Sequence, residues 1–154
     1  MFEGRLVAIY TTAEAGAPME ARPEVEAVVG VGLVGDRYAS KNGKYSETPG
    51  TGREVTLVER ESIAAVRAEG TELADHETRR NLLTEGVPLN HLVGRTFRVG
   101  DVVLRGVRLA EPCSYLAGLT RPNVSRALVH RGGLRADVVE GGMLRPGDAI
   151  TPIS

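Results

Sequence analysis

The sequence predicts a mainly β protein, an antiparallel β-barrel with a few short helices. Glycine is frequent, with 19 residues spread along the chain, and this distribution is typical of turns between many short strands. A Gly-Asp pair occurs at 35–36, 100–101 and 147–148, and its tolerance of turn dihedrals suits tight reversals between antiparallel strands. The sequence contains no repeat of fixed length between these Gly-Asp turns. We therefore expect neither a solenoid nor a parallel βαβ sheet.

The expected strands are runs rich in valine, isoleucine and leucine that stop at turn-forming residues. They cover residues 5–11, 25–34, 55–59, 80–84, 96–99, 102–109, 134–140 and 149–152. Helices are expected near residues 60–69, 88–93 and 112–129. The polar stretch 39–53 has no apolar period, so we expect a mobile surface loop there.

Length and composition limit the possible classes of protein. A chain of 154 residues with 42% hydrophobic content predicts a single domain, 1–154. A formal net charge of −1 gives no general attraction to nucleic acid or to an acidic membrane surface. No basic start with an uninterrupted apolar run appears, and no stretch approaches the roughly 20 apolar residues of a membrane span. We therefore expect a cytoplasmic protein with neither nucleic acid nor membrane as its partner.

Cys113 is the only cysteine, which excludes an internal disulfide and a multi-cysteine zinc site. It follows an expected strand and Pro112, where a helix could begin. The backbone N–H groups of a helix N-terminus stabilise a thiolate, so this position suits a functional thiol. The alternative is an unreactive buried cysteine, because free cysteine is among the most buried residue types.

A basic stretch follows this cysteine. Residues 112–136 contain no aspartate or glutamate but four arginines, namely Arg121, Arg126, Arg131 and Arg135. Guanidinium groups offer paired donors that do not deprotonate, which a phosphate requires. A solvated basic surface is the alternative interpretation.

A second basic element is Arg79-Arg80-Asn81. Adjacent strand residues point to opposite faces, so only one of the two arginines is expected to enter a pocket. The amide of Asn81 both donates and accepts, which suits the edge of a heterocycle. A surface salt bridge to Glu77 beside a turn asparagine is the alternative.

Common catalytic and metal motifs are missing from the sequence. His76, His91 and His130 lack the spacing of a zinc motif, so no histidine metal site is expected. The chain has no G-x-G-x-x-G opening a helix, no G-x-x-x-x-G-K-[ST] and no G-x-S-x-G. A Rossmann dinucleotide site, a P-loop and an α/β-hydrolase are therefore disfavoured.

Several segments together resemble the MOSC family, named for the C-terminal domain of the molybdenum cofactor sulfurases. They run in family order over about residues 28–152, which would be the core of a MOSC-type barrel. The segments are GLVGDRY (32–38), REVTLVE (53–59), TRRNLL (78–83), GRTFRVGD (94–101), EPC (111–113) and the Gly147-Asp148 close.

The resemblance implies a cysteine that either carries sulfur as a persulfide or ligates molybdenum, and basic residues that hold the pterin phosphate of the molybdenum cofactor (molybdopterin). Carried over to this chain, the cysteine is Cys113, and the basic contacts are Arg79, Arg80 and Asn81. Arg121, Arg126, Arg131 and Arg135 are added from charge alone.

The resemblance also bears on partners. The sulfurases have a separate pyridoxal-phosphate domain, and we expect no pyridoxal-phosphate site in this chain. A sulfur donor such as a cysteine desulfurase, or a reductase, would then be required. The leading expectation is sulfur transfer or molybdenum-dependent reduction at Cys113. The alternatives are a carrier of the cofactor without chemistry and a redox-sensing thiol on a barrel.

Overall fold

The structure, a computed structural model, describes residues 2–41, 43, 51–111 and 127–153. The strands are β1 (Gly4–Thr11), β2 (Glu20–Arg22), β3 (Val25–Val28), β4 (Gly32–Leu33), β5 (Val55–Glu59), β6 (Leu82–Glu85), β7 (Thr96–Val99), β8 (Val102–Leu109), β9 (Leu134–Glu140), β10 (Gly142–Leu144) and β11 (Ala149–Pro152). The helical elements of the described residues are α1 (Arg60–Ala68) and two 3-10 turns, η1 (Asp75–Thr78) and η2 (Leu89–Leu92).

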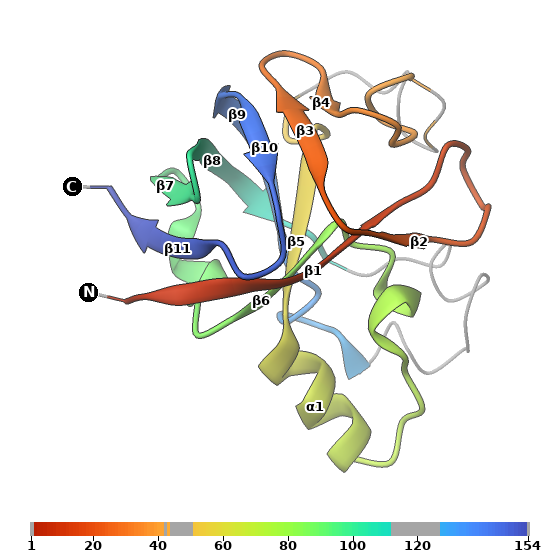
Figure 1. Cartoon of the computed structure of the whole chain (residues 1–154). Helices are drawn as coiled ribbons and strands as arrows, with labels where there is room; N and C mark the ends of the chain where they lie inside the picture. The colour runs from red at the N-terminus through yellow and green to blue at the C-terminus, as the bar shows by residue number, and fades with distance from the viewer. Residues whose placement is uncertain (1, 42, 44–50, 112–126, 154) are drawn as a thin grey trace.

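Seven strands close into a barrel, in the order β11, β7, β8, β9, β5, β6 and β1 (Figure 1). The ring is completed where β1 pairs with β11. Neighbouring strands are antiparallel except β5 and β6, which run parallel with Leu57 opposite Leu82. The crossover through α1 and η1 supplies the long connection that a parallel pair needs. The mainly β barrel predicted from the sequence is confirmed, with this one parallel pair.

A smaller sheet of β10, β3 and β4 accompanies the barrel. The single strand predicted over residues 25–34 is wrong, because this stretch forms two strands joined by a hairpin. Gly30 and Gly32 have φ of +76° and +117°, values that glycine adopts without steric cost. The chain therefore reverses inside a run whose valines alone indicate one continuous strand.

The main hydrophobic core fills the barrel. Phe97 on β7 and Leu104 on β8 are fully buried, as are Leu57 on β5 and Leu134 on β9. Side chains alternate between the two faces of a strand, so each strand contributes every second residue to this core. Burial of a side chain of this size stabilises the fold by about 1.5–3 kcal/mol.

A second apolar cluster lies under α1, on the outer face of β5 and β6. Ile63 and Val66 of α1 pack there with Val58 and Leu83 of the two strands. Leu128, which is 1% exposed, belongs to the same cluster. The chain that returns after residues 112–126 is therefore anchored beside α1.

The helices expected from the sequence are confirmed in part. The helix expected over 88–93 is the short turn η2, and α1 begins and ends close to the predicted 60–69. Most of the helix expected over 112–129, and most of the loop expected over 39–53, lie outside the described residues. No helix in the described part of the chain is long and apolar enough to cross a membrane.

Candidate functional site

Cys113, Arg121 and Arg126 lie outside the described residues, so the roles predicted for them stay predictions. The described chain stops at Glu111 and resumes at Ala127. The candidate site is therefore defined by the barrel residues at which the Cys113 segment, residues 112–126, begins and ends.

Arg80 connects the two ends of this segment. Its guanidinium donates from Nη2 to the backbone oxygen of Ala110 and from Nε to that of Gly132, both at 2.8 Å. The side chain is buried, with the residue 8% exposed. The backbone N–H of Ala110 also donates to the oxygen of Gly133 at 2.8 Å. The chain that leads into the Cys113 segment and the chain that returns from it are thus held together at Ala110 and Gly132.

A second set of contacts, next to the Arg80 hydrogen bonds, involves Glu111, Asn90 and His130. Glu111 accepts a hydrogen bond from the backbone N–H of His130 at 2.8 Å, and its other oxygen lies 3.0 Å from His130 Nδ1. His130 has φ of +62°, a left-handed conformation that is uncommon for a residue with a Cβ. Asn90 donates to the backbone oxygen of His130 at 2.8 Å. These bonds hold the returning chain against the departing one.

Arg131 attaches the same chain to α1. Its Nη2 lies 2.8 and 2.9 Å from the two carboxylate oxygens of Glu69, and its Nε donates to the oxygen of Ala127 at 2.7 Å. The sequence suggested a phosphate contact for Arg131. In the structure this guanidinium anchors the chain to α1.

Asn81, the residue before β6, connects β5 and β1. Its Oδ1 accepts from the backbone N–H of Thr56 at 3.0 Å, and its Nδ2 donates to the oxygen of Tyr10 at 3.1 Å. The residue is 2% exposed. Its amide donor and acceptor serve β5 and β1, whereas the sequence suggested a contact to a heterocycle.

Arg79 belongs to a buried polar cluster with Asp36 and Arg37. Arg37 Nη1 lies 3.2 Å from Asp36 Oδ1, and Arg37 Nη2 donates to the backbone oxygen of Arg79 at 3.4 Å. Asp36 is fully buried and also accepts from the backbone N–H of Thr12. Arg79 itself donates from Nη1 to the oxygen of Ala17 at 2.7 Å. The Gly35-Asp36 corner, which the sequence indicated only as a turn, therefore holds Asp36 in a buried charge pair with Arg37.

Arg135 lies opposite an arginine that sequence reasoning missed. On the neighbouring strands β8 and β9, Arg105 faces Asp137 and Arg108 faces Arg135. The register shifts between these two pairs, because Val107 is an extra residue in β8. A bulge of this kind re-aims the side chains that follow it.

This bulge explains why Arg108 was missed. Val102, Leu104 and Gly106 occupy core positions at every second residue of β8. Strict alternation would send Arg108 into the core as well. The extra residue instead puts Arg108 on the outer face with Arg135. A charged residue where the alternation requires an apolar one is the only signal that the sequence offers.

Positive charge dominates the buried polar groups at this end of the barrel. Among the described buried residues, Arg37, Arg79 and Arg80 are cationic, while Asp36 is the acidic one. Among those same described residues, no group of three or more histidine, cysteine, aspartate or glutamate side chains could hold a metal ion. In the structure these guanidinium groups donate to Asp36 and to backbone oxygens.

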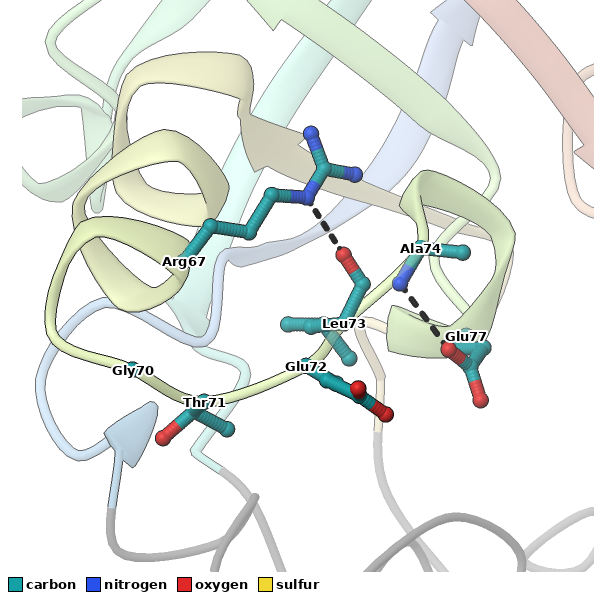
Figure 2. A pocket seen from close by; sticks show the side chains of 7 residues that line it. All are labelled: Arg67, Gly70, Thr71, Glu72, Leu73, Ala74 and Glu77. Atoms are coloured by element: carbon teal, nitrogen blue, oxygen red, sulfur yellow. Dashed lines mark hydrogen bonds between the residues drawn. The ribbon is translucent and has the colours of Figure 1, made fainter.

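A hollow of about 490 Å³ lies elsewhere, between the end of α1 and the loop that leads to η1 (Figure 2). Arg67 lies over it and donates from Nε to the oxygen of Leu73, while Glu77 accepts from the N–H of Ala74 at 2.9 Å. Nearby, burial raises the pKa of Tyr10, with Asp75 adding to this shift and Arg67 opposing it.

A second hollow of about 430 Å³ lies between the start of β1 and the end of β6. Neither hollow is lined by a predicted site residue.

Solved structures with the same fold are known. The chain superimposes on the YuaD protein from Bacillus subtilis with a TM-score of 0.79 at 15% identity, covering 97% of each chain. It matches YiiM from Geobacillus stearothermophilus with a TM-score of 0.72 at 14% identity, covering 98% of this chain and 75% of that one. For YiiM from Escherichia coli the TM-score is 0.66 at 19% identity, with coverage of 97% and 70%. These similarities show the fold.

Sequence comparison identifies the family. No curated protein matches the sequence. The sequence profile of the MOSC domain matches residues 44–151, a range that includes Cys113, the Arg80 contacts and both facing arginines. This chain belongs to the MOSC domain family.

Proposed function

We propose that this protein binds the molybdenum cofactor and uses Cys113 either to ligate molybdenum or to carry sulfur. The observation that carries the proposal is that one buried guanidinium, Arg80, joins Ala110, before the Cys113 segment, to Gly132, after it. A thiol that handles a cofactor must return to one position, and a loop fixed at both ends by a rigid barrel favours that. The family match supports the same assignment.

The described residues fit the cofactor's anionic part. Its phosphate needs donors that keep their charge, and arginine supplies these in a planar fork. Arg79, which is buried, and Arg135 on β9 would supply such groups. The metal ligand would be the thiolate of Cys113.

Two reactions are compatible with this proposal. In the first, Cys113 accepts sulfur as a persulfide from a donor such as a cysteine desulfurase and passes it on. In the second, the cofactor supplies the two-electron redox change for reduction of an N-oxygenated compound, with electrons from a reductase partner. In both, the protein holds the anion with arginine side chains and presents one thiolate.

The test is cofactor content. Wild-type protein and Cys113→Ala are purified from a host that makes the cofactor, and molybdenum and pterin are measured per polypeptide. Arg105→Gln, an exposed arginine on β8, is the matched control. We expect molybdenum in the wild type and in the control, and its loss from Cys113→Ala with an unchanged circular dichroism spectrum. Wild-type protein without molybdenum, pterin or transferable sulfur would overturn the proposal.

A further inference from the structure

The three-stranded sheet of β10, β3 and β4 has one buried face and one outer face. Val25 and Ala27 of β3 are buried, whereas Glu26, between them, is exposed. Met143 of β10 lies opposite Glu26 on one side, and the N–H of Val34 donates to the backbone oxygen of Glu26 at 2.9 Å on the other. Residues that lie opposite each other in a sheet point to the same face. Met143, Glu26 and Val34 therefore form one row on the outer face.

Valine dominates this outer face and the turn beside it. Val34 is 51% exposed, and Val29 and Val31, at the turn between β3 and β4, are 55% and 41% exposed. An antiparallel sheet with a solvated face normally carries polar residues there. Single exposed apolar residues are ordinary, whereas a cluster of them beside polar groups is typical of a binding surface. We call Val29, Val31, Val34 and Glu26 the valine patch.

The chain before β5 fixes the hairpin that carries the valine patch. The carboxylate of Glu54 accepts a hydrogen bond from the N–H of Val138 on β9 at 3.0 Å and another from the N–H of Gly30 in the turn. A Cβ at Gly32 would come within 2.7 Å of the backbone oxygen of Glu54, so the hairpin lies directly against this chain. A surface that is held in place before binding loses less conformational entropy when a partner binds.

We propose that the valine patch is a docking surface for a partner protein that presents apolar side chains around a lysine or arginine. The valines supply the apolar area of such an interface. Glu26 supplies a carboxylate in the same row of side chains, so the complementary surface carries a cation among its apolar groups. The inference goes beyond the proposed function and does not depend on the cofactor.

The charge of Glu26 disfavours two other occupants of the patch. An acidic membrane surface would repel this carboxylate. In a two-fold dimer of this chain the patch would face itself, which brings valines and a second carboxylate to Glu26. Arg145, the arginine that directly follows β10, already lies 3.4 Å from Glu24. A basic partner protein therefore complements the patch better than a membrane or a second copy does.

The test is site-specific photocrosslinking in the native host cell. Benzoyl-phenylalanine replaces Val31 in the patch or, as the matched control, Val93, an exposed valine that follows η2. Each protein is also made with Glu26→Lys, or with Glu14→Lys at an exposed position of the loop between β1 and β2. Mass spectrometry identifies the crosslinked segment of the partner, and circular dichroism checks that each variant keeps its fold.

We expect the probe at Val31 to crosslink a partner protein at a segment with lysine or arginine beside apolar residues, and the probe at Val93 not to give this product. Glu26→Lys should lower the yield by about 10-fold or more, because like charges then face each other. Glu14→Lys should leave the yield unchanged. Changing the partner's basic residue to glutamate should restore crosslinking to Glu26→Lys.

Four results would overturn the inference. They are a product that joins two copies of this chain, a lipid adduct, no product from Val31 beyond that from Val93, and a partner product whose yield Glu26→Lys does not reduce. The yield of the crosslink is measured independently of molybdenum content. The inference and the proposed function can therefore fail separately.

Discussion

Arg80 and Ala110 are joined by a hydrogen bond of 2.8 Å, from the guanidinium Nη2 to the backbone oxygen, across 30 positions of sequence. The same guanidinium reaches Gly132 on the returning chain. One buried side chain thus closes the base of the segment that contains Cys113. The sequence suggested that Arg80 contacts a phosphate, and its position in the structure makes it the fastening of the loop.

Arg80→Ala is expected to lower the free energy of unfolding by about 2–4 kcal/mol, because two buried carbonyl oxygens lose a charged donor. Arg80→Lys should recover only part of this loss, since one ammonium group cannot reproduce the planar fork that spans both oxygens. Urea denaturation measures the free energy of unfolding of both variants. An Arg80→Ala variant as stable as Arg105→Ala, but with weaker phosphate binding, would assign Arg80 to the ligand instead.

Asp36→Ala is expected to cost about 3–5 kcal/mol of stability, because it leaves the Arg37 guanidinium buried beside no carboxylate. The double variant Asp36→Ala/Arg37→Met should recover much of this loss, since it buries neither charge. Thermal unfolding of Asp36→Ala, Arg37→Met and the double variant measures the coupling free energy between the two side chains. Strict additivity of the two single losses would show that the pair does not interact.

Asn81→Ala should destabilise the fold by about 2–3 kcal/mol through loss of the side-chain hydrogen bonds to Thr56 and Tyr10. Asn81→Asp keeps the acceptor for Thr56 but buries a charge and removes the donor to Tyr10, so it should be at least as unstable at neutral pH. Asn90→Ala, which loses one exposed bond to His130, is the control and should cost under about 1 kcal/mol. If Asn81→Ala costs no more than Asn90→Ala, the bridge between β5 and β1 contributes little.

Glu59 gives a pH dependence with a defined sign. Burial raises the pKa of its carboxyl above the ordinary value of 4.5, Glu61 adds to the shift, and the N–H of Leu89 and the side chain of His91 oppose it. The folded protein therefore holds this proton more tightly than the unfolded chain does. The ionised carboxylate therefore destabilises the fold at neutral pH. The contribution of Glu59 to the free energy of unfolding rises as the pH falls from the raised pKa to about 4.5.

Glu59→Gln removes this titration. We expect a higher melting temperature than wild type at pH 7, with the difference shrinking as the pH falls towards 4.5. Glu14→Gln, at an exposed position, is the control and should follow the wild-type curve. A difference between Glu59→Gln and wild type that grows on acidification would contradict the assigned sign.

The barrel could be predicted from the sequence because its strands are regular. Val-rich runs and Gly-Asp corners give local signals, and β5, β7, β8, β9 and β11 lie where those signals place them. The hairpin between β3 and β4 could not be predicted, since Gly30 and Gly32 sit inside a run of valines that indicates one strand. The parallel pairing of β5 with β6 depends on long-range packing, which no local pattern encodes.

The candidate site was predictable as a region but not residue by residue. Composition and family resemblance single out Arg79, Arg80, Asn81 and Arg135, and of these the structure shows Arg80 in contact with the chain on either side of the Cys113 segment. Whether a buried arginine binds a ligand or a backbone carbonyl depends on the tertiary partner, as Arg80 shows. Arg108 was missed because a bulge changes the face of its side chain.

The central claim is that Cys113 is a reactive thiol that the cofactor covers when bound. The most direct measurement is the rate at which iodoacetamide alkylates the native protein, and a single cysteine makes each label report on one position. Cofactor-free protein should react at least as fast as the urea-unfolded chain at pH 7, because the arginines that we propose for the site would favour the thiolate. Cofactor-loaded protein should be protected. Cofactor-free protein that reacts a hundred-fold or more slowly than the unfolded chain would show a buried, inert cysteine and contradict the claim.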